Sequence, residues 1–517
     1  MKAVPLERKA VVLDPTVDHV AVAKRDIPSG TALIFRGKTI KISGSIPAGQ
    51  RFALADIKKG EFLRQYGQPF ARSRGIREGV RIHATNTTRE ISRSRMEKLK
   101  APPKTKLNKK YSIKTFEGFR RKEGRAGTRN YYVVIPTSMC ASEVAARIAS
   151  DLENENKGLL KKYSKVDGIV ALPHTEGCGC DSGIQIDRLL LVLKGYANHP
   201  NVGGCLFVDL GCEQTDRVRV QAFLKDVLRA KAKPIDWITI QENGGIGSTV
   251  KKSKKIILGR LKKVNAIQRE PIPLGELVLG TECGASDSFS GITANPVIGN
   301  VADKIIYAGG SAILTEVTEM VGVFNMLFPR FRSIGVARKF QKLLKWYTQL
   351  ANKMGLTLES NLVAENIKGG LINPYIKNLG AVRKGGTTPI EDVVDYAEPI
   401  TKKGLSLMQG PGNDPESVTG LVASGATVIC FSTGKGAITG SAICPVIKIA
   451  SNERTFLKLP RDIDFDASRL LHDRHSLDSL GEELLGRVIK TASGEKTWSE
   501  KWKQRQFQIW TAGKLSL

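Results

Sequence analysis

Cysteine is scarce in this chain, and long apolar runs are missing altogether. The 517 residues include only eight cysteines, too few for a disulfide scaffold, so free thiols or metal ligands in a reducing compartment are expected. No stretch of about 18 residues is free of polar groups, which excludes a transmembrane helix. The first residues have neither the apolar core nor the cleavage site of a secretory signal. A soluble, cytoplasmic protein without membrane contact is therefore expected.

Acidic residues are also few, 50 against 80 basic ones, which gives a formal net charge of +30. Such a charge attracts nucleic acid, anionic membranes or acidic small molecules. Residues 87–115 hold ten Lys or Arg against two Glu and are expected to form a solvated basic linker. Residues 251–263 and 330–345 are basic with apolar residues at helical spacing, which predicts surface helices. A nucleic-acid surface is the alternative for both segments.

Residues 17–85 have the pattern of a small β-rich unit, with short alternating strands separated by turns that contain glycine. Two Ile-Pro-x-Gly turns, at residues 27–30 and 46–49, indicate a compact, barrel-like domain. This pattern resembles the SAF domain, which lies at the entrance to a carbohydrate-handling site. We expect this domain to span residues 1–86 and to precede the linker.

After the linker, apolar strands alternate with helical stretches, which is typical of α/β proteins with parallel sheets. The expected strands lie in the segments YYVVIP, GIVALP, GCLFVDL, ELVLG, GGSAILTEV and GATVICFS. We predict an α/β catalytic domain over residues 116–325 and a C-terminal α/β domain over residues 326–517.

Three of these strands end in a turn that contains cysteine: PHTEGCG, DLGCEQT and GTECGASD. Ligands bind beyond the carboxyl ends of strands in open α/β sheets, so these turns are expected to share one crevice with the TEVTE segment of the next strand. The expected group comprises His174, Cys178, Cys212, Glu213, Glu282, Cys283, Asp287, Glu316 and Glu319. Such nitrogen, oxygen and sulfur atoms can hold a divalent ion and transfer a proton.

A structural explanation also exists for each of these residues. Cys178 and Cys180 lack the two-residue gap of zinc knuckles, so buried structural thiols are the alternative. His174 caps a turn in the alternative interpretation, and Glu316 and Glu319 cap the N-terminus of a helix. The segment STGKGAITG lacks the spacing of a phosphate loop, so we assign it no nucleotide role.

Taken together, the motifs of the chain resemble those of the altronate and galactarate dehydratase family. They are GRAGTRN (124–130), PTSMC (136–140), HTEGCG (174–179), LGCE (210–213), ECGASDSFSGITANP (282–296), TEVTE (315–319), GAVRKGGTTP (380–389), PGNDPESVTG (411–420), STGKGAITG (432–440) and PVIKIASN (445–452). They follow one another in order, and the resemblance extends from residue 17 to residue 513.

The resemblance implies that the chain removes water from an aldonate or aldarate, such as altronate or galactarate. The product would be a 2-keto-3-deoxy acid, formed through an enolate that a divalent metal, Fe(II) or Mg²⁺, stabilises. Catalytic roles are implied for His174, Glu316 and Lys384. Substrate contacts are implied for Arg129, Asn130, Asp287 and Lys435, and metal ligation for His83, Cys178, Cys212, Glu213, Cys283 and Glu319.

The chain departs from the family pattern near the expected site. Thr85 stands where the family has the second histidine of a His-x-His-Asn motif, which removes one candidate metal ligand. Lys435 stands in place of an arginine and cannot form the same bidentate pair with a carboxylate. The alternative function is therefore a catalytically impaired member that binds RNA or a ribonucleoprotein through its basic linker. The sequence leaves a homo-oligomer open.

Overall fold

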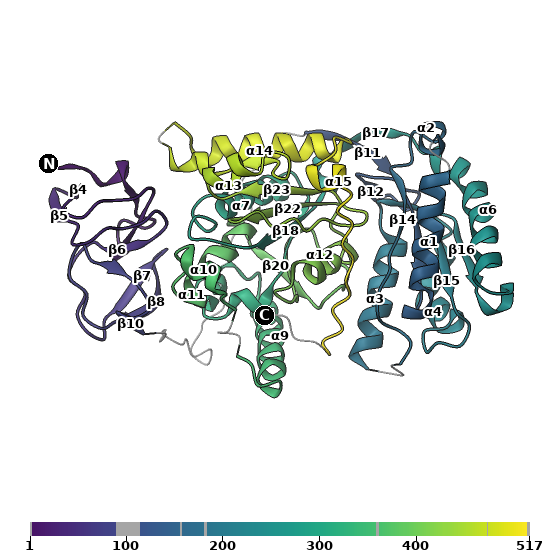
Figure 1. The fold of residues 1–517 in the computed structure, drawn as a ribbon, viewed down its shortest axis with the longest axis horizontal. Coiled ribbons are helices and arrows are strands. Elements are labelled where there is room, and N and C mark those ends of the chain that lie inside the picture. The colour runs from purple at the N-terminus through teal and green to yellow at the C-terminus, as the bar shows by residue number, and fades with distance from the viewer. Residues whose placement is uncertain are drawn as a thin grey trace.

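The computed structural model of the protein describes residues 3–88, 114–155, 158–179, 183–357, 361–472 and 474–513. They form an N-terminal β domain, a second domain with a four-stranded sheet and a C-terminal domain with a seven-stranded sheet. The C-terminal domain lies between the other two, so the N-terminal and second domains are on opposite sides of it (Figure 1). None of the helices described is long and apolar enough to cross a membrane.

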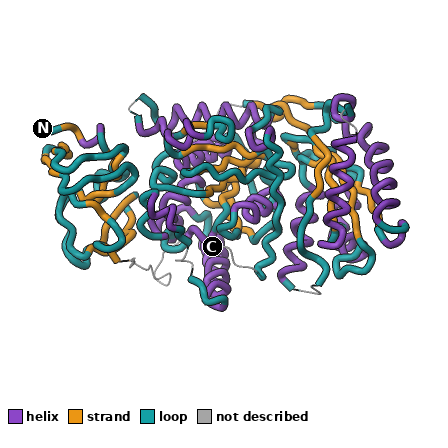
Figure 2. Tube along the Cα trace, viewed as in Figure 1, coloured by secondary structure: helices purple, strands orange, loops and turns teal. Residues whose placement is uncertain are grey.

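The N-terminal domain consists of short strands joined by loops, whereas helices cover the sheets of the other two domains (Figure 2). Its strands are β1 (Val4–Pro5), β2 (Ala10–Val11), β3 (Val20–Ala23), β4 (Ala32–Phe35), β5 (Lys38–Lys41), β6 (Arg51–Ala53), β7 (Phe62–Gln65), β8 (Gln68–Ser73), β9 (Arg81–Ile82) and β10 (Thr87–Thr88). The two turns identified in the sequence meet, because Ile27 and Ile46 form an antiparallel bridge. Ile57 and Ile76 form a second bridge of the same kind. The predicted compact β domain is thus confirmed.

The second domain contains a parallel sheet in the order β14-β13-β15-β16. Its elements are β13 (Tyr131–Pro136), α1 (Met139–Glu155), α2 (Leu159–Lys162), β14 (Gly168–Ala171), α3 (Ile184–Asn198), β15 (Val202–Asp209), α4 (Arg217–Phe223), α5 (Lys225–Ala230), β16 (Ile235–Thr239) and α6 (Ile246–Asn265). Side chains alternate between the two faces of β13: Tyr132 and Val134 pack with α1 and α6, while Val133 and Ile135 pack with α3. Both faces are therefore buried, as in other parallel sheets.

A three-stranded antiparallel sheet is formed by strands that come before and after the second domain in the sequence. It consists of β11 (Thr115–Arg120), β12 (Ala126–Gly127) and β17 (Arg269–Pro273) in the order β12-β11-β17. Because β11 precedes the domain and β17 follows it, their pairing brings the two ends of the domain together.

The C-terminal domain contains a fully parallel sheet in the order β20-β21-β19-β18-β22-β23-β24. Its strands are β18 (Val278–Gly284), β19 (Ser311–Leu314), β20 (Ile390–Val394), β21 (Gly404–Met408), β22 (Val428–Thr433), β23 (Val446–Ala450) and β24 (Phe465–Asp466). Its longer helices are α7 (Ala294–Tyr307), α9 (Ile334–Lys353), α11 (Pro374–Ala381), α12 (Asp414–Ala423) and α14 (Leu477–Ala492). The domain boundary expected between residues 325 and 326 falls inside this sheet, because β18 and β19 lie between β21 and β22.

The two basic segments are surface helices, as predicted. Helix α6 buries Ile257 and Leu261 on one face, and α9 buries Phe340 and Tyr347. Their lysines and arginines therefore form the outer faces of amphipathic helices. The basic linker 87–115 lies outside the described residues, apart from its first two and last two positions.

Candidate active site

A cluster of buried acidic and basic side chains lies at the carboxyl ends of β18 and β19. Lys384, in the short 3-10 helix η8 (Val382–Gly385), places its Nζ 2.7 Å from Cys283 Sγ and 2.8 Å from Glu316 Oε2. Cys283 Sγ is also 3.5 Å from one carboxylate oxygen each of Glu316 and Glu319. Lys377 Nζ, from α11, is 2.7 Å from Glu319 Oε1. We call these five residues the lysine–glutamate cluster.

The register of the sheet explains why these residues meet. Thr281 of β18 lies beside Leu314 of β19, so the residues that follow both positions emerge at the same edge. Glu316 adopts a left-handed backbone conformation, with φ at +64°. This conformation is costly for a residue with a β-carbon and persists only where the surrounding structure imposes it. The turn after β19 therefore holds the Glu316 carboxylate in a defined place.

Burial and neighbouring charge set the ionisation of the cluster. Burial, together with the carboxylate of Glu319, raises the pKa of Glu316 to about 7. Burial also opposes ionisation of Glu319, but Lys377 and Lys384 outweigh it and hold the pKa of Glu319 below its usual value. Burial likewise disfavours the charged form of Lys384, yet Cys283 and both glutamates raise its pKa well above the ordinary range. Near neutral pH, Glu316 is thus the group that gains or loses a proton.

Three members of the cluster have the chemistry of metal ligands. Cys283, Glu316 and Glu319 each offer one ligand atom, and these atoms all lie within 4.8 Å of one another. A donor set of one sulfur and two oxygens suits Fe(II) better than Mg²⁺, which prefers oxygen alone. Lys384 competes with an ion for this place, because its ammonium lies between Cys283 and Glu316. The ligands therefore fit Fe(II) by type, and binding requires that Lys384 moves aside or loses its proton.

A basic cavity of about 490 Å³ opens beside the loop that follows β18. Its charged lining residues are Lys24, Arg25, Asp287, Lys368, Lys435, Glu453, Arg454 and Lys458. Asp287 also lines a small neighbouring cavity whose wall includes Lys377 of the cluster. Six cations against two carboxylates make the larger cavity attractive to anionic molecules.

Lys435 and Asp287, two residues predicted to contact substrate, thus line the same cavity. The side chain of Lys435 is 47% exposed and lies 3.8 Å from Glu365 Oε2, so it is accessible to a ligand. The carboxylate of Asp287 is buried and accepts hydrogen bonds from Ser290, Ser451 and Asn452. Asp287 therefore joins three loops at the floor of the cavity and has little capacity left for substrate.

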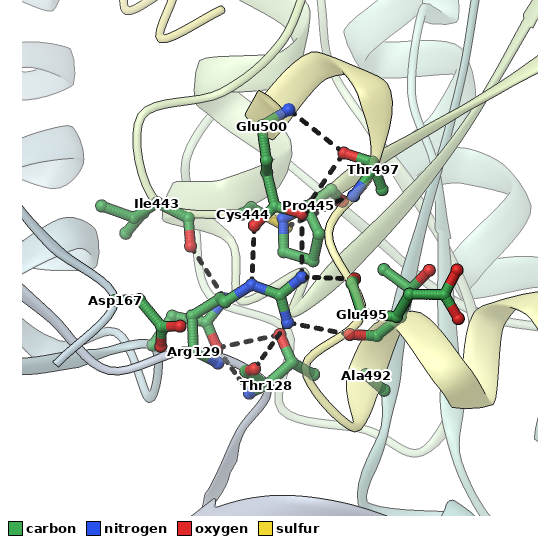
Figure 3. A network of polar contacts seen from close by, with 12 residues as sticks. Thr128, Arg129, Asp167, Ile443, Cys444, Pro445, Ala492, Glu495, Thr497 and Glu500 are labelled. Carbon is green, nitrogen blue, oxygen red and sulfur yellow. Dashed lines mark hydrogen bonds and ion pairs between the residues drawn. The ribbon is translucent and has the colours of Figure 1, made fainter. Parts of the chain in front are cut away.

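Arg129 and Asn130 do not line this cavity and have other partners. The Arg129 guanidinium forms a bidentate pair with Glu500, at 2.6 and 2.8 Å, and donates to three backbone carbonyls (Figure 3). Asn130 donates to the carbonyls of Lys165 and Val264. Both side chains are buried and saturated with hydrogen bonds, so they hold the second domain together and to the C-terminal domain. These partners give Arg129 and Asn130 a structural role, and their contact with substrate stays a prediction.

His174, Cys178, Cys212 and Glu213 lie in the second domain, not beside the lysine–glutamate cluster. The turns that were expected to share one crevice thus belong to two different sheets. His174 is buried, with Nε2 2.9 Å from the Pro136 carbonyl and Nδ1 accepting from the Glu176 amide. Burial lowers its pKa to about 4. With both nitrogens engaged, His174 is better placed to fix the two loops than to act as an acid or base.

His83 also stands apart from the cluster, in the loop after β9 of the N-terminal domain. Its Nδ1 is 2.6 Å from the hydroxyl of Thr85, the residue in place of the family's second histidine. Burial lowers the pKa of His83, with a smaller effect from Arg81. His83 was predicted to be a metal ligand, and this arrangement does not place a second metal ligand beside it.

Two buried cations near the site were missed in the sequence. Lys377 lies in α11, one turn before the end of a helix that the sequence pattern did not single out. Arg51 comes from β6 of the N-terminal domain and donates to Ser288 Oγ at 3.0 Å and to the carbonyl of Gly370. No local motif marks either residue, because each acquires its role from contacts more than 50 residues away. The contact of Arg51 with Ser288 places the N-terminal domain against the loop that follows β18, the strand that carries Cys283.

Three family patterns together cover nearly the whole chain. Residues 8–90 match the altronate/galactarate dehydratase SAF domain, residues 118–265 match the second domain of D-galactarate dehydratase/altronate hydrolase, and residues 274–515 match the C-terminal part of D-galactarate/altronate dehydratase. The chain is 32% identical to an altronate dehydratase of Bacillus subtilis, covering 96% of this chain and 97% of the relative.

Two relatives from Escherichia coli are similar at 30% identity. One is an altronate dehydratase, with 96% of this chain and 98% of the relative covered. The other is a galactarate dehydratase (L-threo-forming), with 94% and 93% covered. A match at this level over all three domains shows the reaction class as well as the fold. The chain therefore belongs to the altronate and galactarate dehydratase family and is a sugar-acid dehydratase, a lyase of carbon–oxygen bonds.

Proposed function

We propose that the chain dehydrates altronate or galactarate to the corresponding 2-keto-3-deoxy acid at the lysine–glutamate cluster. The observation that carries this proposal is the buried contact of the Lys384 ammonium with Glu316, a carboxyl group that titrates near neutral pH. A base with a pKa near the working pH and a fixed cation beside it are the two groups that removal of a proton next to a carboxylate requires. Relatives that act on these two acids support the choice of substrate.

In the proposed reaction, the Glu316 carboxylate removes the proton at C2 of the sugar acid. The electron pair of the broken C–H bond forms the double bond between C2 and C3, while the C3–O bond breaks and the hydroxyl leaves as water with a proton from the cluster. The resulting enol tautomerises to the 2-keto acid. Lys384 stabilises the negative charge that develops on the substrate carboxylate. A divalent ion held by Cys283 and Glu319, with Lys384 moved aside toward the substrate carboxylate, would make the C2 proton more acidic and leave Glu316 free to act as the base.

The basic cavity supplies the route for the substrate in this proposal. Its lysines and arginines attract the carboxylate, and Asp287 at its floor separates it from the small cavity that Lys377 lines. The substrate panel that tests the proposal contains altronate, galactarate and their stereoisomers, incubated without air and with Fe(II) or Mg²⁺. Formation of a 2-keto-3-deoxy acid from altronate or galactarate is expected. If neither acid is consumed with either metal, the proposed substrates are wrong.

The pH dependence of the reaction follows from the ionisation of Glu316. Because its pKa is raised to about 7, kcat/KM is expected to rise as the pH passes through 7 and then to level off. Glu316→Gln removes this rise and lowers kcat by roughly 10² to 10⁴-fold, the usual contribution of a general base. Glu270→Gln is the control, since Glu270 pairs with Arg120 on the surface. A wild-type profile in Glu316→Gln would rule out Glu316 as the base.

The same carboxyl group makes the folded protein less stable as the pH rises, whereas it makes the enzyme more active. The folded protein favours protonated Glu316, so the contribution of this group to stability is present below its unfolded pKa of about 4.3 and is lost as the pH rises through 7. Glu316→Gln mimics the protonated form. The free energy of unfolding of this variant is therefore expected to decline less between pH 5 and pH 8 than that of the wild type. This pH range covers most of the interval between the unfolded and the folded pKa of Glu316. Urea unfolding at the two pH values measures the difference.

Lys435 offers a test of the substrate route. Lys435→Met removes an accessible cation from the cavity and is expected to raise KM about tenfold, since a lost interaction of about 1.4 kcal/mol corresponds to that factor. Because Lys435 has no contact with the cluster, kcat is expected to change little. Lys435→Arg keeps the charge and should retain a low KM, and Lys345→Met on α9 is the control for loss of a surface charge. An unchanged KM in Lys435→Met would place the substrate elsewhere.

A further inference from the structure

A cavity of about 360 Å³ lies where the second domain meets the C-terminal domain. The second domain contributes the second half of α3, including Leu191 and Lys194, and the residues that follow this helix. The C-terminal domain contributes Val278 and Ser311, the first residues of β18 and β19, and the loop between β20 and β21. This interdomain cavity is thus at the amino ends of the strands, whereas the lysine–glutamate cluster is at their carboxyl ends.

Contacts between the two domains fix the walls of the interdomain cavity. Helices α3 and α12 pack against each other (Figure 1). A β-carbon at Gly195 of α3 would lie 2.5 Å from the carbonyl oxygen of Ala423, the last residue of α12, so this approach requires glycine. The chain then turns at Gly425, where φ is +114° and a β-carbon would meet no atom within 4 Å. The Nε2 of His199 lies 3.1 Å from the Ala426 carbonyl oxygen, which is a further contact across the domains.

Much of the lining is apolar. Leu191, Val278 and Ile400 are each half-buried and line the open space, and Ala397 and Ala423 add small side chains. Binding sites for small molecules have cavities of this size, lined mainly by apolar side chains with a few polar groups. A sugar acid has hydroxyl groups along its whole carbon chain, and against such walls they would lose hydrogen bonds. The interdomain cavity therefore suits a less polar molecule than the proposed substrates.

The charged residues of the lining are mostly basic. Lys194 comes from α3, and Lys402 comes from the facing loop, so the cations approach from both domains. Lys194 pairs with Asp226 and Lys402 with Asp392, but an ammonium group has three donors and can also pair with a ligand. Four cations stand against one carboxylate in the lining: Arg125, Lys194, Lys402 and Lys403 against Glu276.

The ionisation of a buried wall residue is consistent with this excess of positive charge. Burial has the largest effect on His199 and lowers its pKa well below the ordinary value. The charges of Arg125, Lys233 and Arg121 lower this pKa further, and no carboxylate is among the groups with the largest effects on it. His199 is therefore neutral near pH 7. An anion in the interdomain cavity would reduce the repulsion between the cations around it.

We propose that the interdomain cavity binds a small amphipathic anion, an apolar ring system that carries one carboxylate, sulfonate or phosphate group. The ring system packs against Leu191, Val278 and Ile400, and the anionic group pairs with the lysines of the lining. The ligand contacts both domains, so its binding stabilises their association. This site goes beyond the proposed dehydration, because its ligand is not a sugar acid and its residues are not those of the lysine–glutamate cluster.

Fluorescence titration of the full-length protein with 8-anilino-1-naphthalenesulfonate tests the proposal, because this probe combines an apolar ring system with one sulfonate. The wild type is expected to show a saturable site for about one equivalent of the probe. N-phenyl-1-naphthylamine has the same rings without the sulfonate and is expected to bind at least about fivefold more weakly. Sodium sulfate, an anion without an apolar part, should displace the probe poorly, and galactarate should not displace it.

Two variants with matched controls locate the bound probe. Ile400→Trp fills part of the interdomain cavity and is expected to weaken binding at least about tenfold, whereas Val218→Trp, on the exposed face of α4, should not. Lys402→Met removes one cation and is expected to weaken binding about threefold to fivefold. Lys339→Met is its control, because Lys339 pairs with the same Asp392 carboxylate and is similarly exposed, 58% against 52%, but does not line the interdomain cavity.

The melting temperature, followed by circular dichroism, gives a second readout. The probe is expected to raise the melting temperature of the wild type and of Val218→Trp but not that of Ile400→Trp. Lys435→Met, which changes the basic cavity beside β18, should bind the probe as the wild type does. If Ile400→Trp does not fold, the comparison of Lys402→Met with Lys339→Met decides.

Several results would overturn the proposal. They are the absence of a saturable site in the wild type, equal binding by the wild type and a folded Ile400→Trp, and equal binding by Lys402→Met and Lys339→Met. Loss of binding in Lys435→Met, or displacement of the probe by galactarate, would place the probe in the substrate cavity and would also overturn it. None of these measurements uses turnover, so their outcome is independent of the proposed dehydration.

Discussion

Lys384→Met is expected to abolish dehydratase activity, with kcat lowered at least 10³-fold, while the chain remains folded. Lys384 is the only side chain that contacts both Cys283 and Glu316 among the described residues, and it lies 1% exposed at the centre of the cluster. Without its charge, the negative charge that develops on the substrate has no fixed cation beside it, a loss that costs about 10² to 10³-fold for a single donor. Glu316 would also be protonated at a higher pH, which removes the base at neutral pH.

The measurement compares kcat for altronate and galactarate in Lys384→Met, in the wild type and in Lys304→Met. Lys304 is a suitable control because its ion pairs with Asp478 and Glu482 lie on α7 and α14, away from the cluster. Near-UV circular dichroism and the melting temperature of each variant check the fold. A folded Lys384→Met that keeps a tenth or more of the wild-type kcat would show that the reaction takes place elsewhere.

Arg129→Met is expected to have the largest effect on stability, lowering the free energy of unfolding by about 3–5 kcal/mol. The Arg129 side chain is 1% exposed and its partner Glu500 9%, so the substitution leaves a buried carboxylate without its counter-charge. It also removes the Arg129 donor from the carbonyls of Thr491 and Glu495, of which Thr491 keeps the hydrogen bond from the Gly494 amide. These contacts link the segment between β12 and β13, at the start of the second domain, to the C-terminal part of the chain (Figure 3).

The urea concentration at the midpoint of unfolding tests this expectation, provided that the dependence of the unfolding free energy on urea concentration has the same slope in each variant. Arg129→Met combined with Glu500→Met should recover part of the loss, because the double variant removes the unpaired charge. Arg120→Met is the control: Arg120 and Glu270 are 38% and 51% exposed, and such a pair contributes less than about 1 kcal/mol. A shift in Arg129→Met no larger than that in Arg120→Met would contradict the structural role of Arg129 and leave it available for substrate.

Much of the fold was predictable from local patterns in the sequence. The Ile-Pro-x-Gly turns predicted the N-terminal domain, and the apolar strands before helices predicted the parallel sheets. The order of the strands was not predictable, because Leu279 of β18 pairs with Val428 of β22 and Ser311 of β19 pairs with Gly404 of β21, both far along the chain. A boundary placed after residue 325 therefore cut through a single sheet.

The candidate site was predictable in part. Cys283, Glu316, Glu319 and Lys384 come from motifs at the ends of strands, and the structure brings them together. The same reasoning grouped them with Cys178 and Cys212, since turns after parallel strands look alike whichever sheet they belong to. Only the order of the strands, which assigns these turns to two different sheets, separates the cluster residues from Cys178 and Cys212.

The most direct test of the central claim is the product formed from altronate and galactarate by wild-type protein and by folded Glu316→Gln and Lys384→Met. We predict that the wild type converts one of these acids to a 2-keto-3-deoxy acid with a rate that rises through pH 7, and that neither variant does so at a measurable rate. Formation of the product at wild-type rates by either variant would contradict the assignment of the chemistry to the lysine–glutamate cluster.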